Sequence, residues 1–74
     1  MKADEFKRIR KQLGFTQNEM ARLLGFAGAQ TVKNIEGGGI NPGKLVMKLL
    51  RYLDSLPENK AMTFIEELNR HEPK

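Results

Sequence analysis

The apolar residues of this chain recur every three or four positions, and glycines divide the pattern into short segments. Phe6, Ile9 and Leu13 have this spacing in a segment otherwise rich in Lys, Arg and Glu, which predicts an amphipathic helix over residues 2–13. Gly14 follows and is expected to end that helix. No segment alternates apolar and polar residues as a strand does. The pattern therefore predicts an all-α fold.

The second and third predicted helices are short and closely spaced. Thr16 and Glu19 form a T-x-x-E capping box for the second helix, and Gly25 is expected to end it. Its buried face should comprise Met20, Ala21, Leu23 and Leu24. Gly28 then makes a tight bend before a third helix over residues 29–36. Two of its residues share a buried face, Val32 and Ile35.

Two further helices follow. Gly37, Gly38 and Gly39 end the third helix, after which Asn41 is expected to cap and Pro42 to open a fourth. The residues expected to point inward from it are Leu45, Val46, Leu49, Leu50 and Leu53. Ser55, with Pro57 and Glu58 after it, predicts the cap of a fifth helix that runs to about residue 69. Its apolar stripe comprises Ala61, Phe64, Ile65 and Leu68.

Length and composition restrict what such a bundle can do. A chain of 74 residues is expected to form one domain, residues 1–74, with residues 56–70 as a C-terminal helix that caps the core and mediates dimerisation. The absence of cysteine excludes disulfides and thiolate metal sites and suits a reducing cytosol. The chain also lacks an apolar stretch long enough for a membrane span or a secretory signal. We therefore expect a soluble cytoplasmic protein with no membrane partner.

The positive charge of the chain is unevenly distributed. The net charge is +4, with ten Lys/Arg against four Asp/Glu in residues 1–53 and three against five in residues 54–74. A basic module of this size favours a polyanionic partner, most often nucleic acid, although lysines also simply solvate helix surfaces.

Nothing in the chain predicts an enzyme, a cofactor or a metal site. His71 is the only histidine, and no second histidine or cysteine could complete a metal site or relay with it. Glu66 and Glu67 are adjacent in sequence and so diverge on a helix. "EGGG" lacks the context of a phosphate-binding loop.

Two short helices joined by a glycine-containing bend, the second polar on its outer face, are typical of a helix-turn-helix motif. "IRKQLGFTQNEMARLLG" followed by "TVKNIEGG" resembles the Cro/CI (Xre-type) helix-turn-helix family over roughly residues 6–53. The resemblance implies a five-helix, lambda-repressor-like DNA-binding domain with the motif in helices two and three. It also implies double-stranded DNA as the partner.

The resemblance further assigns roles to individual residues. Thr16 and Gln17 match the positions that hold a DNA phosphate at the start of the second helix, where unpaired N–H groups favour an anion. Arg10 and Glu36 match an ion pair between the first helix and the end of the third. The remaining expected phosphate contacts are Thr31, Gly38 and Lys44.

The third helix is expected to read bases. The candidate side chains are Ala29, Gln30, Lys33 and Asn34. Gln bonds adenine bidentately, Lys donates to guanine, and Ala leaves room for a thymine methyl group. The run "GFAGAQ" holds one residue more than the usual turn of the family, so the register of the first recognition residues is open. The three glycines are expected to let main-chain N–H groups approach phosphates, with a flexible connector as the alternative.

Two functions agree with these features. The first is a dimeric transcriptional repressor on a pseudo-palindromic operator that autoregulates its own operon, since small solitary members of the family resemble regulators from phages and mobile elements, including anti-CRISPR-associated ones. The second is an antitoxin that binds a toxin protein, because "LLRYLDSLPE" resembles the end of some antitoxin domains. Repression of the chain's own operon is common to both functions, and a homodimer is expected with its interface at Tyr52, Met62, Ile65 and Leu68.

Overall fold

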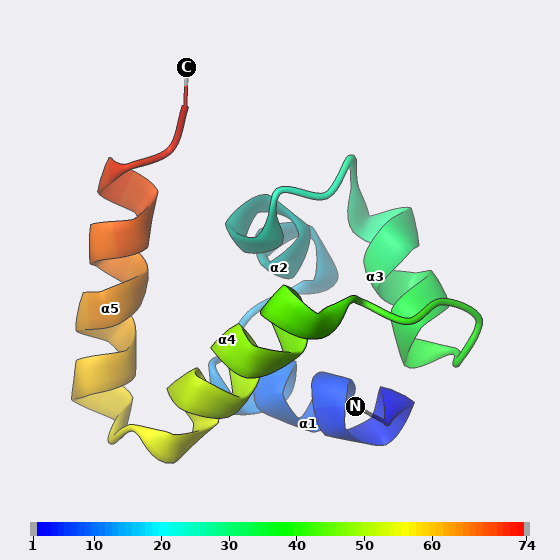
Figure 1. The fold of residues 1–74 in the computed structure, drawn as a ribbon, viewed down its shortest axis with the longest axis horizontal. Coiled ribbons are helices and arrows are strands. Elements are labelled where there is room, and N and C mark those ends of the chain that lie inside the picture. The colour runs from blue at the N-terminus through cyan, green and yellow to red at the C-terminus, as the bar shows by residue number, and fades with distance from the viewer. Residues whose placement is uncertain (1, 74) are drawn as a thin grey trace.

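A computed structural model describes residues 2–73, and over that range the chain forms five helices and no strand. The helices are α1 (Ala3–Gln12), α2 (Gln17–Leu24), α3 (Ala29–Glu36), α4 (Lys44–Ser55) and α5 (Glu58–Arg70). Figure 1 shows α5 rising along one side of the molecule from the end of α4, while α3 lies at the opposite side. The predicted all-α, lambda-repressor-like architecture is confirmed.

Local signals explain why the first helices begin and end where they do. Gly14 has a φ of 77° and donates its N–H to the Lys11 carbonyl at 3.0 Å, which closes the end of α1. The predicted capping box of α2 is present, because Thr16 Oγ1 accepts from the Glu19 N–H at 3.1 Å and Glu19 Oε1 accepts from the Thr16 N–H at 3.0 Å. Hydrogen bonding of the Glu19 carboxylate to the Thr16 main chain, and secondly to the Thr16 side chain, lowers the pKa of Glu19.

Two predicted caps are wrong. Asn41 does not cap a helix that opens at Pro42, because α4 begins at Lys44 after Gly43, whose φ is 93°. The Asn41 side chain instead makes a local turn, in which its Oδ1 accepts from the Gly43 N–H at 3.0 Å. Ser55 is the last residue of α4 and donates its hydroxyl to the Tyr52 carbonyl at 2.6 Å, so it cannot cap α5.

Every helix contributes to one hydrophobic core. The core residues, each at most 3% exposed, are Phe6, Ile9, Met20, Ala21, Val32, Ile35, Leu50, Leu53, Ala61 and Ile65. Leu45 was predicted to point inward, yet it is 78% exposed. It lies five positions before Leu50, which is about 140° around the helix, so the two side chains leave α4 on different sides.

The fifth helix covers more of the core than the sequence suggests. Ile65 was expected to meet a partner subunit because little core should remain near the chain end, but it is 3% exposed and belongs to the core of its own chain. We correct that expectation: α5 folds back beside α2, so Ile65 lies with Phe15 and Leu23. Phe64 is half-buried, and its ring packs edge-on against the ring of Tyr52, with 5.3 Å between the ring centroids. None of the described helices has the length and apolar character needed to cross a membrane.

Candidate nucleic-acid interface

The turn between α2 and α3 sets the relative orientation of the two helices. Gly25 ends α2 with a φ of 74°, and the Phe26 N–H returns to the Ala21 carbonyl at 2.9 Å. Gly28 precedes α3 in an extended conformation, with a φ of 177° and no side-chain cap. The helix begins at Ala29, as predicted, so the additional residue of "GFAGAQ" lies in the turn.

A buried polar network at the start of α2 joins the first three helices. Arg10 Nε donates to Glu36 Oε2 at 2.6 Å and Arg10 Nη2 donates to Glu36 Oε1 at 3.1 Å. Arg10 Nη1 also donates to the Phe15 carbonyl at 2.9 Å, and Gln17 Nε2 donates to Glu36 Oε1 at 3.3 Å. The pair expected between Arg10 and Glu36 is therefore present. It holds the end of α3 against α1 and the start of α2.

The network controls the charge of Glu36. Burial raises the pKa of this carboxyl group, but the hydrogen bonds from Arg10 and Gln17 outweigh burial, and the positive charges of Arg10 and Lys7 add to their effect. The pKa of Glu36 therefore lies below its usual value. Glu36 is ionised at neutral pH, and its charge is balanced inside the fold instead of facing a DNA phosphate.

The residues expected to read bases lie on the outer side of α3. Val32 and Ile35 are buried, and Gln30, Lys33 and Asn34 are exposed on the opposite side. Ala29 and Thr31 flank that face and are half-buried. This polar face, which we call the α3 face (Gln30, Lys33, Asn34), is free of contact with the core.

The expected phosphate contacts have different surroundings. Thr16 is exposed, but the capping box already accepts the N–H groups of Thr16 and Glu19, so the N–H groups of Gln17 and Asn18 are the ones with no carbonyl one turn earlier. The amide of Gln17 already donates to Glu36, which leaves its second N–H for another acceptor. Lys44 is exposed at the start of α4.

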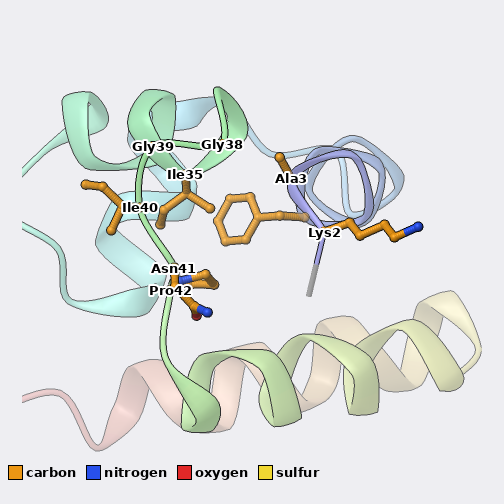
Figure 2. A pocket seen from close by; sticks show the side chains of 9 residues that line it. Lys2, Ala3, Ile35, Gly38, Gly39, Ile40, Asn41 and Pro42 are labelled. Atoms are coloured by element: carbon orange, nitrogen blue, oxygen red, sulfur yellow. The ribbon is translucent and has the colours of Figure 1, made fainter.

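The glycine run acts as the cap of α3. Gly37 donates its N–H to the Lys33 carbonyl at 2.9 Å, Gly38 to Ile35 at 3.1 Å and Gly39 to Asn34 at 2.9 Å. Gly38 needs glycine because its φ is 84°. The Ile35 carbonyl accepts the Gly38 N–H in this structure, and the expected contact of Gly38 with a phosphate stays a prediction. Figure 2 shows the segment leaving α3 and passing through Ile40, Asn41 and Pro42 toward α4.

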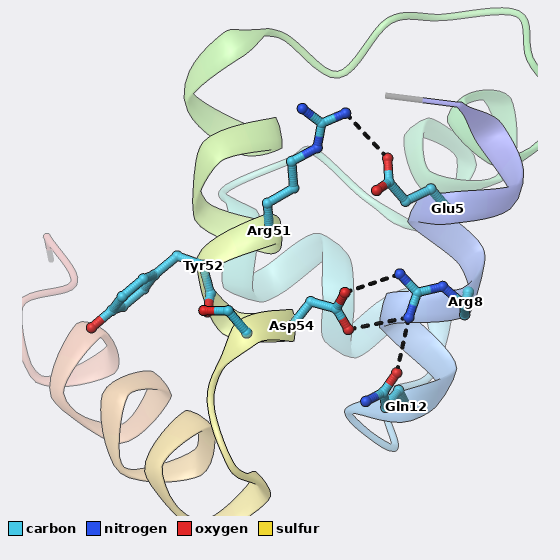
Figure 3. A network of polar contacts seen from close by, with 7 residues as sticks. Glu5, Arg8, Gln12, Arg51, Tyr52 and Asp54 are labelled. Atoms are coloured by element: carbon cyan, nitrogen blue, oxygen red, sulfur yellow. Dashed lines mark hydrogen bonds and ion pairs between the residues drawn. The ribbon is translucent and has the colours of Figure 1, made fainter.

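Four of the five arginines in the described part of the chain form ion pairs, and Arg22 does not. Arg8, Arg10, Arg51 and Arg70 form these ion pairs with Asp54, Glu36, Glu5 and Glu67. Figure 3 shows the two pairs that join α1 to α4. The lysines between residues 2 and 73 form no ion pair there, so no carboxylate occupies the ammonium groups of Lys33 and Lys44, which are available to an external anion.

An apolar groove lies on another side of the molecule. It is lined by Leu23, Leu24, Leu45, Val46, Leu49 and Leu68, with the C-terminal residues 71–73 at its edge. Of the residues expected at a dimer interface, Leu68 lines this groove, Met62 is half-buried and Tyr52 is 50% exposed.

Comparison with known families agrees with this geometry. A family model described as Helix-turn-helix matches residues 6–58, a span that runs from within α1 to the first residue of α5 and includes the whole α2–α3 unit. The chain belongs to the Cro/CI-type helix-turn-helix family. Neither the curated proteins nor the solved structures gave a significant match. Membership makes the chain a DNA-binding transcription regulator.

Sequence reasoning missed the contacts between α1 and α4. Arg8 pairs with Asp54 and Arg51 with Glu5, each across 46 positions of sequence. Opposite charges on two amphipathic helices are a signal that such pairs are available, but only the packing of α1 on α4 decides which ones form.

Proposed function

We propose that this chain is a sequence-specific transcriptional repressor that binds its operator through the α3 face. The observation that carries the proposal is the arrangement of α3. Its outer side chains are exposed, while its end is held against α1 and α2 by the Arg10–Glu36 pair at 2.6 Å. A recognition helix needs this combination, because base readout requires free side chains on a helix of fixed orientation.

The phosphate contacts in this proposal come from the elements on either side of α3. The first turn of α2, with Thr16 and Gln17, offers N–H groups and a partial positive charge to one phosphate. Lys44, at the start of α4, supplies a full charge to another. Repression follows when the bound protein blocks access of the polymerase to the promoter.

A dimer on a pseudo-palindromic operator completes the proposal. One recognition helix spans too few base pairs to specify a site in a genome, and two-fold symmetry doubles the contacts. The groove beside α5 supports an interface, because Leu45 and Leu68 both line it and Leu45 is 78% exposed. With Tyr52 and Met62 it supplies apolar surface that a second copy would cover. Autoregulation, in a phage or mobile-element operon of the anti-CRISPR-associated type, is the role that small regulators of this kind suggest.

The proposal is tested with the DNA upstream of the chain's own coding sequence. We expect the protein to prefer this duplex over a random duplex of equal length and to lower transcription from it. Lys44→Ala should weaken binding to both duplexes and reduce the slope of log K against log salt by about 0.9. Lys60→Ala, an exposed lysine on α5, serves as the control and should leave the slope unchanged. Equal affinity for the two duplexes would overturn autoregulation, and a slope unchanged by Lys44→Ala would remove Lys44 from the interface.

The groove also favours a second candidate, an antitoxin that holds a toxin protein there. A toxin encoded beside this gene should then copurify with the chain, and Leu45→Glu should release it. If the toxin stays bound to that variant, or if Leu45→Glu instead converts a dimer to a monomer in the absence of any toxin, the groove is not the toxin site.

A further inference from the structure

Two side chains of the α3 face are bonded to each other. Gln30 Nε2 donates to Asn34 Oδ1 at 3.0 Å, across one turn of the helix. Both side chains are exposed, so the bond is made on the outer surface and packing does not force it. Lys33 lies beside them on the same face and has only donors, so it cannot replace Asn34 as an acceptor.

The bond determines which polar groups remain for a ligand. A glutamine amide has two N–H donors and one carbonyl oxygen, so Gln30 keeps one N–H and its Oε1 after it donates to Asn34. That remaining donor and acceptor are the two groups needed to bond adenine at N7 and N6. Asn34 turns its oxygen toward Gln30, which leaves its NH₂ group as a donor only. Guanine is the base that places two acceptors, N7 and O6, side by side in the major groove.

We infer that Asn34 is a specificity-determining residue, which orients the Gln30 amide to read adenine and itself donates to a guanine nearby. The inference rests on the proposed function, because it requires the α3 face to enter the major groove. Residues four positions apart on a helix are separated by about 6 Å along its axis, and base pairs are stacked about 3.4 Å apart. The guanine therefore lies one or two base pairs from the adenine.

The alternative is that the two amides act independently. Gln30 could then rotate about its own side-chain bonds and would read adenine equally well without Asn34. The two arrangements predict different results for variants of Asn34. Alanine removes the acceptor, whereas aspartate keeps an acceptor in the same place, removes the donors and adds a negative charge, which weakens binding to every duplex and leaves the base preferences as the measure.

In the experiment, a library of duplexes with a randomised core is incubated with the wild-type protein and with each of three variants, Asn34→Ala, Asn34→Asp and Gln30→Ala. Asn59→Ala, an exposed asparagine in the first turn of α5, is the matched control. The bound fractions are sequenced, and circular dichroism checks that each variant is folded. In the wild type we expect adenine to be preferred at one position by roughly 5-fold to 150-fold, with a guanine one or two positions away.

The two Asn34 variants have different expected motifs. Asn34→Ala should reduce the adenine preference to less than about 3-fold and abolish the guanine preference. Asn34→Asp should retain adenine and replace guanine by cytosine, whose N4 amino group donates to a carboxylate. Asn59→Ala should reproduce the wild-type motif. If Asn34→Ala keeps the wild-type adenine preference, whether or not guanine is lost, the two amides act independently, the inference is wrong and the proposed function stands. If the wild type selects no motif, the proposed function itself fails.

Discussion

Two arginines of α1, only two positions apart, each hold a carboxylate of a later helix, yet their surroundings differ. Arg10 pairs with Glu36 of α3, and the side chains are 10% and 6% exposed. Arg8 pairs with Asp54 of α4 through two bonds of 3.1 and 3.0 Å, and these side chains are 52% and 27% exposed. Figure 3 shows the second pair, in which Arg8 also donates to Gln12 at 3.0 Å. The chemistry is shared, and burial distinguishes the two pairs.

Burial changes what each pair does for the molecule. Water competes with Asp54 for Arg8, so that pair adds little to stability. The Arg10 pair is shielded from water, so loss of one partner leaves an uncompensated charge inside the protein. The buried pair also reaches the start of α2 through Gln17 and Phe15. It therefore connects stability to the geometry of the α2–α3 unit.

The largest predicted effect comes from removing one buried partner. Arg10→Ala should lower the free energy of unfolding by about 3–5 kcal/mol, because Glu36 is left buried without its counter-charge. Urea denaturation measures the change. The double variant Arg10→Met with Glu36→Leu removes both charges and should be much more stable than Arg10→Ala. A loss below about 1 kcal/mol in Arg10→Ala would show that the pair behaves like an exposed one.

A smaller effect is expected when Glu36 loses its charge but keeps its shape. Glu36→Gln should lower the free energy of unfolding by about 1–3 kcal/mol at neutral pH, because hydrogen bonds to a charged acceptor are lost. The pKa of Glu36 is lowered in the folded state, so the folded protein binds fewer protons than the unfolded chain. The stabilisation is fully present above the unfolded pKa of about 4.3 and is lost as pH falls through the folded value.

Glu36→Gln should therefore lose less stability than the wild type on acidification below about pH 4.3. Asp54→Asn provides the comparison, because its hydrogen bond from Arg8 also lowers the pKa of Asp54, but at an exposed site. Urea denaturation at several pH values measures the free energy of unfolding. If it falls equally with pH in the wild type and in Glu36→Gln, the pKa of Glu36 is not lowered in the folded state.

The comparison also separates what the sequence could predict from what it could not. The five helices follow from apolar spacing and from strong local signals, such as Gly14, which ends α1, and the Thr16–Glu19 box, which starts α2. These signals lie within a few residues of the structure they cause. The Arg10–Glu36 pair was predicted only because the motif resembles a family. The exposed Arg8–Asp54 pair has the same residue types and was missed.

The sequence-based predictions were wrong where a local signal was compatible with more than one structure. Asn41 and Ser55 both bond to the main chain nearby, and neither caps the helix that follows. Three glycines are compatible with a flexible loop, a phosphate contact or a helix cap; the hydrogen bonds of Gly37 to Gly39 form the cap, and a phosphate contact of Gly38 stays a prediction. Ile65 was misplaced because helical spacing identifies an apolar face but not the surface that covers it. The residues of the α3 face are exposed as expected, and their contacts with DNA stay a prediction.

The smallest predicted effect concerns the exposed pair. Arg8→Ala should lower Tm by less than about 4 °C, because water replaces Asp54 as a partner and holding two long side chains together costs entropy. The difference from wild type should shrink further in 1 M salt, where the Debye length is about 3 Å. Arg8→Gln controls for lost packing of the side-chain stem, since it retains part of the aliphatic chain. DNA binding should change little in either variant, because this pair joins α1 to α4 and does not contact α2 or α3. If thermal denaturation instead gave a loss as large as that of Arg10→Ala, unaffected by salt, burial would not be what separates the two pairs.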